Sequence, residues 1–142
     1  MRLAALLVDD TGTAEEVVQD AFVKLQGVWE RVESPEAYLR ATVVNLSRSR
    51  LRRRMVARRI VPWFVPHAPS ASERAMLRDD QREVIEALRA LPRRQRECLV
   101  LRYYLDLSQL EIAAMLGVST GTVKTHAHRG LAALETRLRG RL

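Results

Sequence analysis

A run of short hydroxyl side chains followed by cations marks the stretch from Ser119 to Arg129. Together they would form the outer face of a helix, and the candidate residues are Ser119, Thr120, Thr122, Lys124, Thr125, His128 and Arg129. Such a face suits a helix in the major groove of DNA, reading base edges near its start and binding phosphate along its flank. Backbone amides at the helix start could also hold a phosphate. We therefore expect this face to bind duplex DNA.

Two helices and a tight turn must position that face. Ser108 and Glu111 have the spacing of a capping box, which predicts a helix that begins at Gln109. Gly117 stands where this helix must end with a positive φ, and Ser119 can cap the helix that follows. The residues expected to face inward are Ile112, Ala113, Leu116, Val118, Val123, Ala127, Leu131 and Leu134. The pattern predicts a helix-turn-helix.

The first half of the chain predicts a helix from Thr13 to Trp29. Thr13 and Glu16 have capping-box spacing. The apolar residues at helical spacing are Val17, Val18, Ala21, Phe22, Leu25 and Val28, which we expect on the inner face. The opposite face carries Glu16, Gln19, Asp20 and Val23, and is mostly acidic. On the residues alone, this acidic face is either solvated or a surface for a partner.

A second helix is expected from Pro35 to about Arg54. Ser34 can cap it, and proline is favoured at the first helical position. Its inner stripe would be Leu39, Val43 and Leu46, whereas Arg40, Val44, Asn45, Arg48 and Arg52 would point elsewhere. Arginine fills seven of the twelve positions 48–59. Attraction to the C-terminal helix dipole accounts for only one or two of these cations.

Residues 62–80 read as a linker, because three prolines and small residues interrupt any periodicity. Trp63 and Phe64 are unusual there and could dock on a neighbouring surface. Two further helices are expected, over about 73–90 and 93–104. Their core candidates are Val84, Ile85, Leu88, Cys98, Leu99, Leu101 and Leu105.

Composition narrows the class of function. The 142 residues carry a net charge of +7, which favours a polyanionic partner. Cys98 is the single cysteine, so no internal disulfide and no thiolate zinc cluster can form. His126 and His128 lie two apart, so on a helix they point in different directions and cannot share a metal. We expect no cofactor, no membrane association, a cytoplasmic location and no enzymatic activity.

The expected fold class is all-α. Two small helical domains, residues 1–61 and 81–142, would be joined by a flexible linker at 62–80, and the C-terminal domain would contain the helix-turn-helix.

Both halves resemble bacterial RNA polymerase sigma factors. "SQLEIAAMLGVSTGTVKTHAHRGLAALETRL" resembles their region four, and "LRALPRRQRECLVLRYYLDLS" resembles the helices that precede it. "TAEEVVQDAFVKLQGVW" resembles the region two helix that binds core polymerase. "SPEAYLRATVVNLSRSRLRRR" resembles the adjoining helix, which reads and melts the downstream promoter element. Two such halves joined by a short linker resemble the extracytoplasmic-function (ECF, sigma-24-like) group.

This resemblance implies roles for the residues named above. Glu16, Gln19 and Asp20 would contact the β′ clamp of core RNA polymerase, and the β flap would be a further contact of the polymerase. The loop 30–34 and the side chains of Arg40, Asn45, Arg48 and Arg52 would hold the non-template strand of promoter DNA. The Ser119–Arg129 face would read the upstream promoter element as duplex. An anti-sigma factor is a candidate further partner.

The chain departs from the family pattern at two places. The family has a further helix, or most of one, before the segment that opens here, and "MRLAALLV" stands in its place. We therefore expect region two to be less stable than region four, or to need a partner that covers it. His126 replaces an arginine that is frequent in the family.

Other classes of function remain as alternatives. "TVKTH" is equally at home in LuxR-type regulators, which act as dimers on palindromic DNA, but that class accounts for the second half only. A helical adaptor with basic helices for RNA or anionic lipid is a third class. A basic nuclease is the last.

Overall fold

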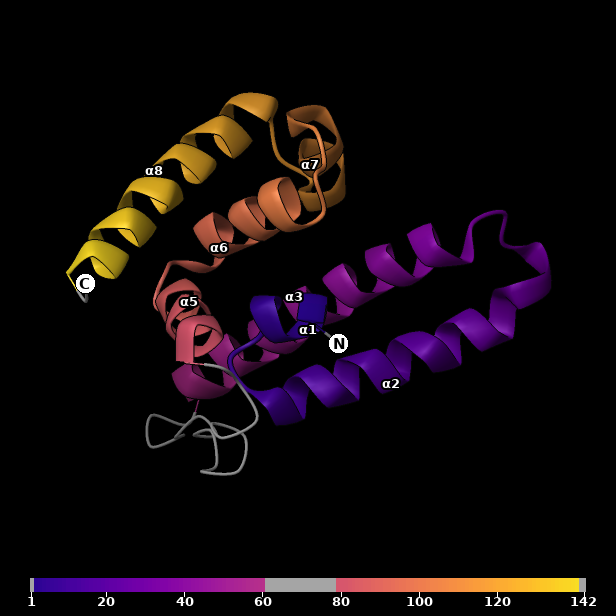
Figure 1. Cartoon of the computed structure of the whole chain (residues 1–142). Coiled ribbons are helices and arrows are strands. Elements are labelled where there is room, and N and C mark those ends of the chain that lie inside the picture. Colours follow the sequence, from indigo (N-terminus) through magenta and orange to yellow (C-terminus); the bar gives the residue numbers. More distant parts are fainter. Residues whose placement is uncertain (1, 61–78, 141–142) are drawn as a thin grey trace. The chain divides into compact units, whose positions relative to one another are not determined.

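The computed structural model describes residues 2–60 and 79–140, and gives the backbone alone for 54–60 and 79–80. Every regular element in these ranges is helical, which confirms the expected all-α class (Figure 1). The chain divides into two compact units, Met1–Met76 and Leu77–Leu142. The linker prediction, with Trp63 and Phe64, lies outside the described residues.

The first unit contains α1 (Arg2–Leu7), α2 (Thr11–Val28), the 3₁₀ turn η1 (Trp29–Arg31) and α3 (Pro35–Ile60). Helices α2 and α3 lie side by side and run in opposite directions, and α1 contacts both (Figure 1). The long helices are joined by η1 and three further residues, which form the loop end of the unit.

The predicted capping box at the start of α2 is wrong. The cap is Asp10, whose Oδ1 accepts from the Thr13 N–H at 2.8 Å and whose Oδ2 accepts from the Thr13 hydroxyl at 3.0 Å. Helix α2 therefore begins at Thr11, and Thr13 is buried inside its first turn. Aspartate is among the strongest capping residues, and it stands early enough to add another half-turn to the helix.

We expect Asp10→Ala to destabilise the first unit by about 2 kcal/mol, because it removes both bonds to Thr13 at a site that is 1% exposed. Amide hydrogen exchange along α2 should accelerate, while exchange in the second unit should not change. Asp10→Asn keeps a capping oxygen and should retain most of the protection. Equal protection of α2 in the alanine variant and in the wild type would contradict this role.

The core of the first unit differs in part from the predicted stripes. Val17, Ala21 and Leu25 are buried as expected, but Phe22 is 54% exposed. On α3 the stripe is displaced by about one residue. Val44 is fully buried, together with Val43, Ser47 and Leu51, whereas Leu39 and Leu46 are half-buried. The helix also continues past Arg54 to Ile60.

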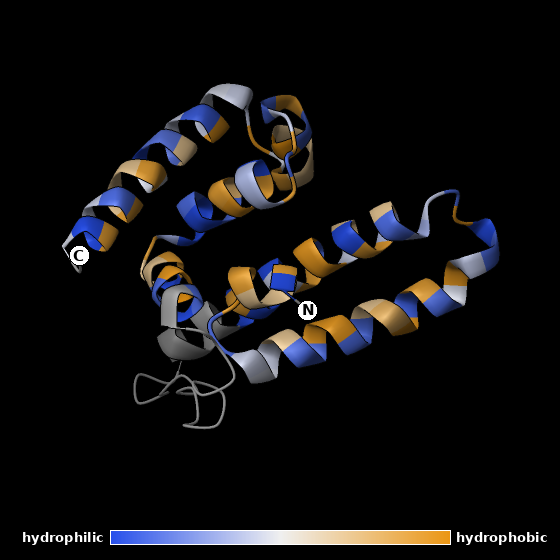
Figure 2. Cartoon of the chain, viewed as in Figure 1, coloured by the Kyte–Doolittle hydropathy of each residue, from blue (hydrophilic) through white to orange (hydrophobic). Residues whose placement is uncertain are grey.

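The second unit contains α5 (Asp79–Arg89), α6 (Arg93–Leu99), the π-helical turn η2 (Val100–Tyr104), α7 (Gln109–Leu116) and α8 (Thr120–Arg139). The Leu105 N–H donates to the Val100 carbonyl at 3.2 Å, which closes the wider π turn. Figure 2 shows apolar and hydrophilic residues alternating along α8, as an amphipathic helix requires. On α5, Leu88 is buried as expected, Ile85 is half-buried, and Val84 is 39% exposed.

The predicted helix-turn-helix is confirmed in detail. Ser108 Oγ accepts from the Glu111 N–H at 3.1 Å, and Glu111 Oε1 accepts from the Ser108 N–H at 3.3 Å. Helix α7 ends at Gly117, which has φ +70°. Ser119 then caps α8 by accepting from the Thr122 N–H at 3.1 Å. Two serine caps and one glycine thus fix where both helices begin and where the first one ends.

The inner stripe of α8 was predicted correctly at Val123 and wrongly at Leu131, which is 41% exposed. Gly130 is the buried residue at that level of the helix. A Cβ atom at Gly130 would lie 3.1 Å from Gln95 Cβ and 3.1 Å from Leu99 Cδ1. Helices α6 and α8 therefore approach closely because position 130 has no side chain.

Helix α6 itself carries two buried charged side chains, Arg96 and Glu97. Arg96 is 5% exposed and donates to the Leu88 and Arg89 carbonyls, both at 3.1 Å, so it satisfies the end of α5. Glu97 is 1% exposed, with Arg93 and Arg94 at 3.7 Å and 3.5 Å. The next residue, Cys98, is a buried free thiol, and burial together with the charge of Glu97 raises its pKa to about 11.

Candidate functional site

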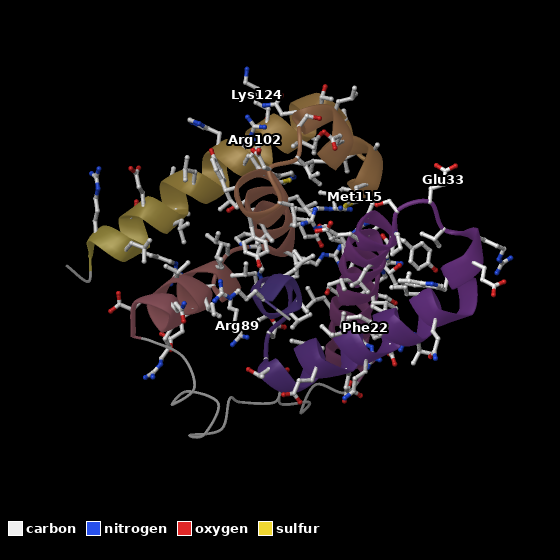
Figure 3. All side chains as sticks on the ribbon, turned by 45° about the vertical axis from the view of Figure 1, so that its right-hand side comes forward. Phe22, Glu33, Arg89, Arg102, Met115 and Lys124 are labelled. Atoms are coloured by element: carbon white, nitrogen blue, oxygen red, sulfur yellow. The ribbon has the colours of Figure 1, made fainter. Side chains whose placement is uncertain are left out.

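The predicted DNA-reading residues lie together on the outer side of the first half of α8. All but Thr122 are exposed, and the set is Ser119, Thr120, Thr122, Lys124, Thr125, His128 and Arg129. Lys124 projects away from the body of its unit (Figure 3). Gly121 is exposed on the same side, and a Cβ there would meet nothing nearer than 3.9 Å. The face is free of bulky apolar side chains, as entry into a major groove requires.

Thr122 also contacts Ser119, the N-cap of α8. Its side-chain oxygen lies 2.8 Å from Ser119 Oγ, and its N–H donates to the same serine oxygen. The side chain is half-buried against the cap and is therefore held in one place. Thr120 and Thr125 are the more exposed of the three threonines.

The four candidates on α3 do not share one environment. Asn45 and Arg52 are exposed, and Arg48 is half-buried. Arg40 is exposed but donates to Glu36 at 2.8 Å, one turn earlier on the same helix. The helix begins as predicted, since the Ala37 N–H donates to Ser34 Oγ at 3.3 Å. Glu33 projects outward from the loop that precedes the helix (Figure 3).

The acidic candidates on α2 have a partner inside the chain, which sequence reasoning missed. Arg50 of α3 reaches across to α2 and donates to Glu16 at 2.7 Å and to Asp20 at 2.6 Å. The two carboxylates are one helical turn apart, and one guanidinium bridges them. Gln19, the third candidate, is exposed. The sequence gives no signal for this bridge, because Arg50 is one of many arginines in the second half of α3.

The sequence placed Val23 on the outer face correctly but missed the exposure of two aromatic side chains, Phe22 and Trp29. Phe22, Val23 and Trp29 are 54%, 66% and 59% exposed. Phe22 and Trp29 are seven residues apart, which places them along one side of the helix axis. Large exposed apolar side chains along one side of a helix indicate an interaction surface. The signal in the sequence was the aromatic residue at the helix end, directly before the loop.

No metal-binding constellation of three or more His, Cys, Asp or Glu side chains occurs within residues 2–60 and 79–140. His126 and His128 stand two apart on α8, as their positions in the sequence required. In the same described ranges, no helix has the length and apolar character that crossing a bilayer would need.

The fold and the α8 face define a helical DNA-binding protein with a helix-turn-helix in its second unit. The sigma-70 region 4 family matches residues 80–134, and the sigma-70 region 2 family matches residues 1–56. The RNA polymerase sigma-E factor of Streptomyces coelicolor is 34% identical over 143 residues, covering 97% of this chain and 78% of that protein. The ECF sigma factor SigK of Mycobacterium bovis is 26% identical over 141 residues, covering 93% and 75%.

A solved structure agrees in fold. The sigma factor RpoE of Bartonella quintana, determined in complex with the anti-sigma factor NepR, superposes with a TM-score of 0.75 at 25% identity, over 97% of this chain and 88% of that one. The chain belongs to the RNA polymerase sigma factors, in the ECF group. It is a sigma factor that directs RNA polymerase to specific promoters. Both halves match this family, so the LuxR alternative has no support.

Proposed function

We propose a division of labour between the two units. Residues 81–142 act as region four and hold the upstream promoter element as duplex through the α8 face. Residues 1–61 act as region two, contacting core polymerase through α2 and the separated non-template strand through α3. Residues 62–80 connect them. The observation that carries this proposal is the exposed α8 face, where hydroxyls and cations gather behind a capped helix start.

The charge on the α8 face supports duplex binding. Lys124 and Arg129 can neutralise phosphates, while Thr120, Thr122 and Thr125 are short enough to reach base edges from the helix surface. Because Thr122 is bonded to the Ser119 cap, its position relative to the groove is fixed before DNA arrives. The exposed hydroxyls of Thr120 and Thr125 would determine which base pairs the chain prefers in the upstream element.

On the first unit, two kinds of surface support two kinds of partner. Asn45 and Arg52 are exposed along α3 and suit a single strand of DNA, whose phosphates pair with cations and whose bases stack or bond. The exposed side of α2 carries carboxylates, Gln19 and the apolar Phe22 and Val23, and DNA would be repelled there. A protein surface with basic groups fits α2 better, and we assign this contact to the β′ clamp of core polymerase. The β flap is proposed as a contact of the second unit.

The proposal extends to regulation and location. RpoE of Bartonella quintana was solved bound to an anti-sigma factor, which supports an anti-sigma protein as a further partner of this chain. The chain would work in the cytoplasm, where core polymerase and promoter DNA are found. All covalent chemistry would belong to the polymerase, and this chain would contribute binding energy alone.

Replacing Thr125 with alanine tests the reading of bases. The variant should keep its stability, because Thr125 is exposed, but should change which bases it prefers in the upstream element. The measurement is binding of the full chain to a duplex library, sequenced before and after selection. An unchanged preference, with uniformly weaker binding to every duplex, would assign Thr125 to the phosphates instead and contradict the prediction.

A further inference from the structure

The Arg50 bridge stands at the boundary between the two proposed binding surfaces of the first unit. Its guanidinium donates one nitrogen to Glu16 Oε2 and the other to Asp20 Oδ2. Arg50 is 28% exposed, whereas Glu16 is 62% and Asp20 is 48% exposed. The cation is therefore the best-shielded member of the three, and the carboxylates extend outward from it.

This geometry leaves the carboxylates accessible but weakens their field. One positive and two negative groups give the cluster a net charge of one minus instead of two. Each carboxylate still has an oxygen that Arg50 does not occupy. A cation that approaches these free oxygens is attracted by both carboxylates and repelled by the guanidinium behind them.

We propose that Arg50 is an affinity-setting residue for core polymerase, acting as an internal competitor for the carboxylates of Glu16 and Asp20. The inference rests on the proposed function, in which a cationic protein surface docks on these two side chains. Arg50 donates one charge-assisted hydrogen bond to each carboxylate, the same kind of contact that a partner arginine would supply. The chain consequently binds core polymerase more weakly than its acidic pair alone would allow.

The opposite role is a purely structural one, in which Arg50 only joins α2 to α3. Both roles give a loss of stability when Arg50 is removed, because two ion pairs between the helices disappear. They differ in the affinity for the partner. A structural residue leaves that affinity unchanged or lowers it, whereas an internal competitor raises it when removed.

The test is a titration of purified core RNA polymerase into the full chain, labelled at its C-terminus and followed by anisotropy. Arg50→Gln should bind about three- to tenfold more tightly at roughly 50 mM salt. The gain should become smaller as the salt concentration rises, because salt screens the attraction between the exposed carboxylates and the cations of the partner. Arg50→Met keeps the aliphatic stem, guards against misfolding of the first variant, and should show the same gain. Arg50→Lys keeps the positive charge, so its affinity for core polymerase should equal that of the wild type.

Two matched controls make the result specific. Arg53→Gln removes one exposed arginine from the same helix and should leave affinity unchanged. In a chain that carries both Glu16→Gln and Asp20→Asn, Arg50→Gln should give no gain, because nothing remains for the guanidinium to occupy. Unchanged or weaker binding by folded Arg50→Gln and Arg50→Met at low salt overturns the inference.

The same set of variants separates the inference from the function on which it rests. If Glu16→Gln with Asp20→Asn weakens core binding but neither Arg50 variant strengthens it, only the competitor role is wrong. If the acidic pair can be neutralised without any change in core binding, the assignment of these carboxylates to polymerase fails, and the inference fails with it.

Discussion

Replacing Gly130 with valine is expected to disrupt the second unit and to remove duplex binding with it. A Cβ at this position would already lie 3.1 Å from Gln95 and from Leu99, closer than ordinary van der Waals contact, and valine adds two methyl groups beyond it. Overpacking of this kind typically costs about 1–3 kcal/mol, and a β-branched residue fits a helix less well than alanine does. The result would be measured as an earlier unfolding of α6 and α8 by amide hydrogen exchange.

Two variants serve as controls for the Gly130 prediction. Gly121→Val places the same side chain on the same helix at an exposed position, where a Cβ meets nothing nearer than 3.9 Å, and should destabilise far less. Gly130→Ala introduces a close contact, which destabilises the unit, but it also raises the helix propensity by roughly 1 kcal/mol. Its net effect on stability should therefore be close to zero. If Gly130→Val and Gly121→Val change stability equally, close approach of α6 and α8 is not what position 130 provides.

Replacing Lys124 with glutamate should weaken binding to the duplex upstream element by about 30-fold at low salt, for every sequence tested. The change removes one cation and adds one anion on the exposed side of α8, where phosphates would lie. The slope of log affinity against log salt should fall by about one, as expected for one lost phosphate contact. Lys124→Ala should show the same loss of slope with a smaller loss of affinity.

The chain offers a matched control for that substitution, because Lys24 and Lys124 are its only lysines. Lys24→Glu changes the net charge of the protein equally, but on α2 of the first unit. It should leave binding to the isolated upstream element nearly unchanged. Equal losses for the two variants would mean that overall charge, and not the α8 face, attracts this duplex.

The caps and the turn of the helix-turn-helix could be predicted from the sequence almost residue by residue. Ser108, Glu111, Gly117 and Ser119 act through contacts within four residues along the chain, so their spacing carries the information. The spacing of residues could not predict the contact between α6 and α8. The helical periodicity predicted that Leu131 is buried. Gly130 is buried instead, because Gln95 and Leu99, more than thirty positions away in the sequence, leave little room for a side chain there.

The first unit was harder to predict for the same physical reason. Thr13 and Asp10 both offer a helix cap, and the choice between them depends on burial that the sequence does not display. Phe22 has the spacing of a core residue, yet the inner side of α2 is already filled by smaller side chains. The bridge from Arg50 to Glu16 and Asp20 spans 34 and 30 residues, and only the pairing of α2 with α3 reveals it. The predicted residues on α8 lie on one exposed face because their placement depends on local spacing, whereas the surroundings of those on α2 depend on tertiary contacts.

The most direct measurement is reconstitution of transcription from purified components. The chain is added to core RNA polymerase that lacks any other sigma factor, with genomic DNA as template, and the 5′ ends of the transcripts are mapped. The account predicts new start sites that share two conserved elements at a constant spacing, and the loss of most of these starts with Lys124→Glu. Stable binding to duplex DNA, with no association with core polymerase and no new start sites, would contradict it.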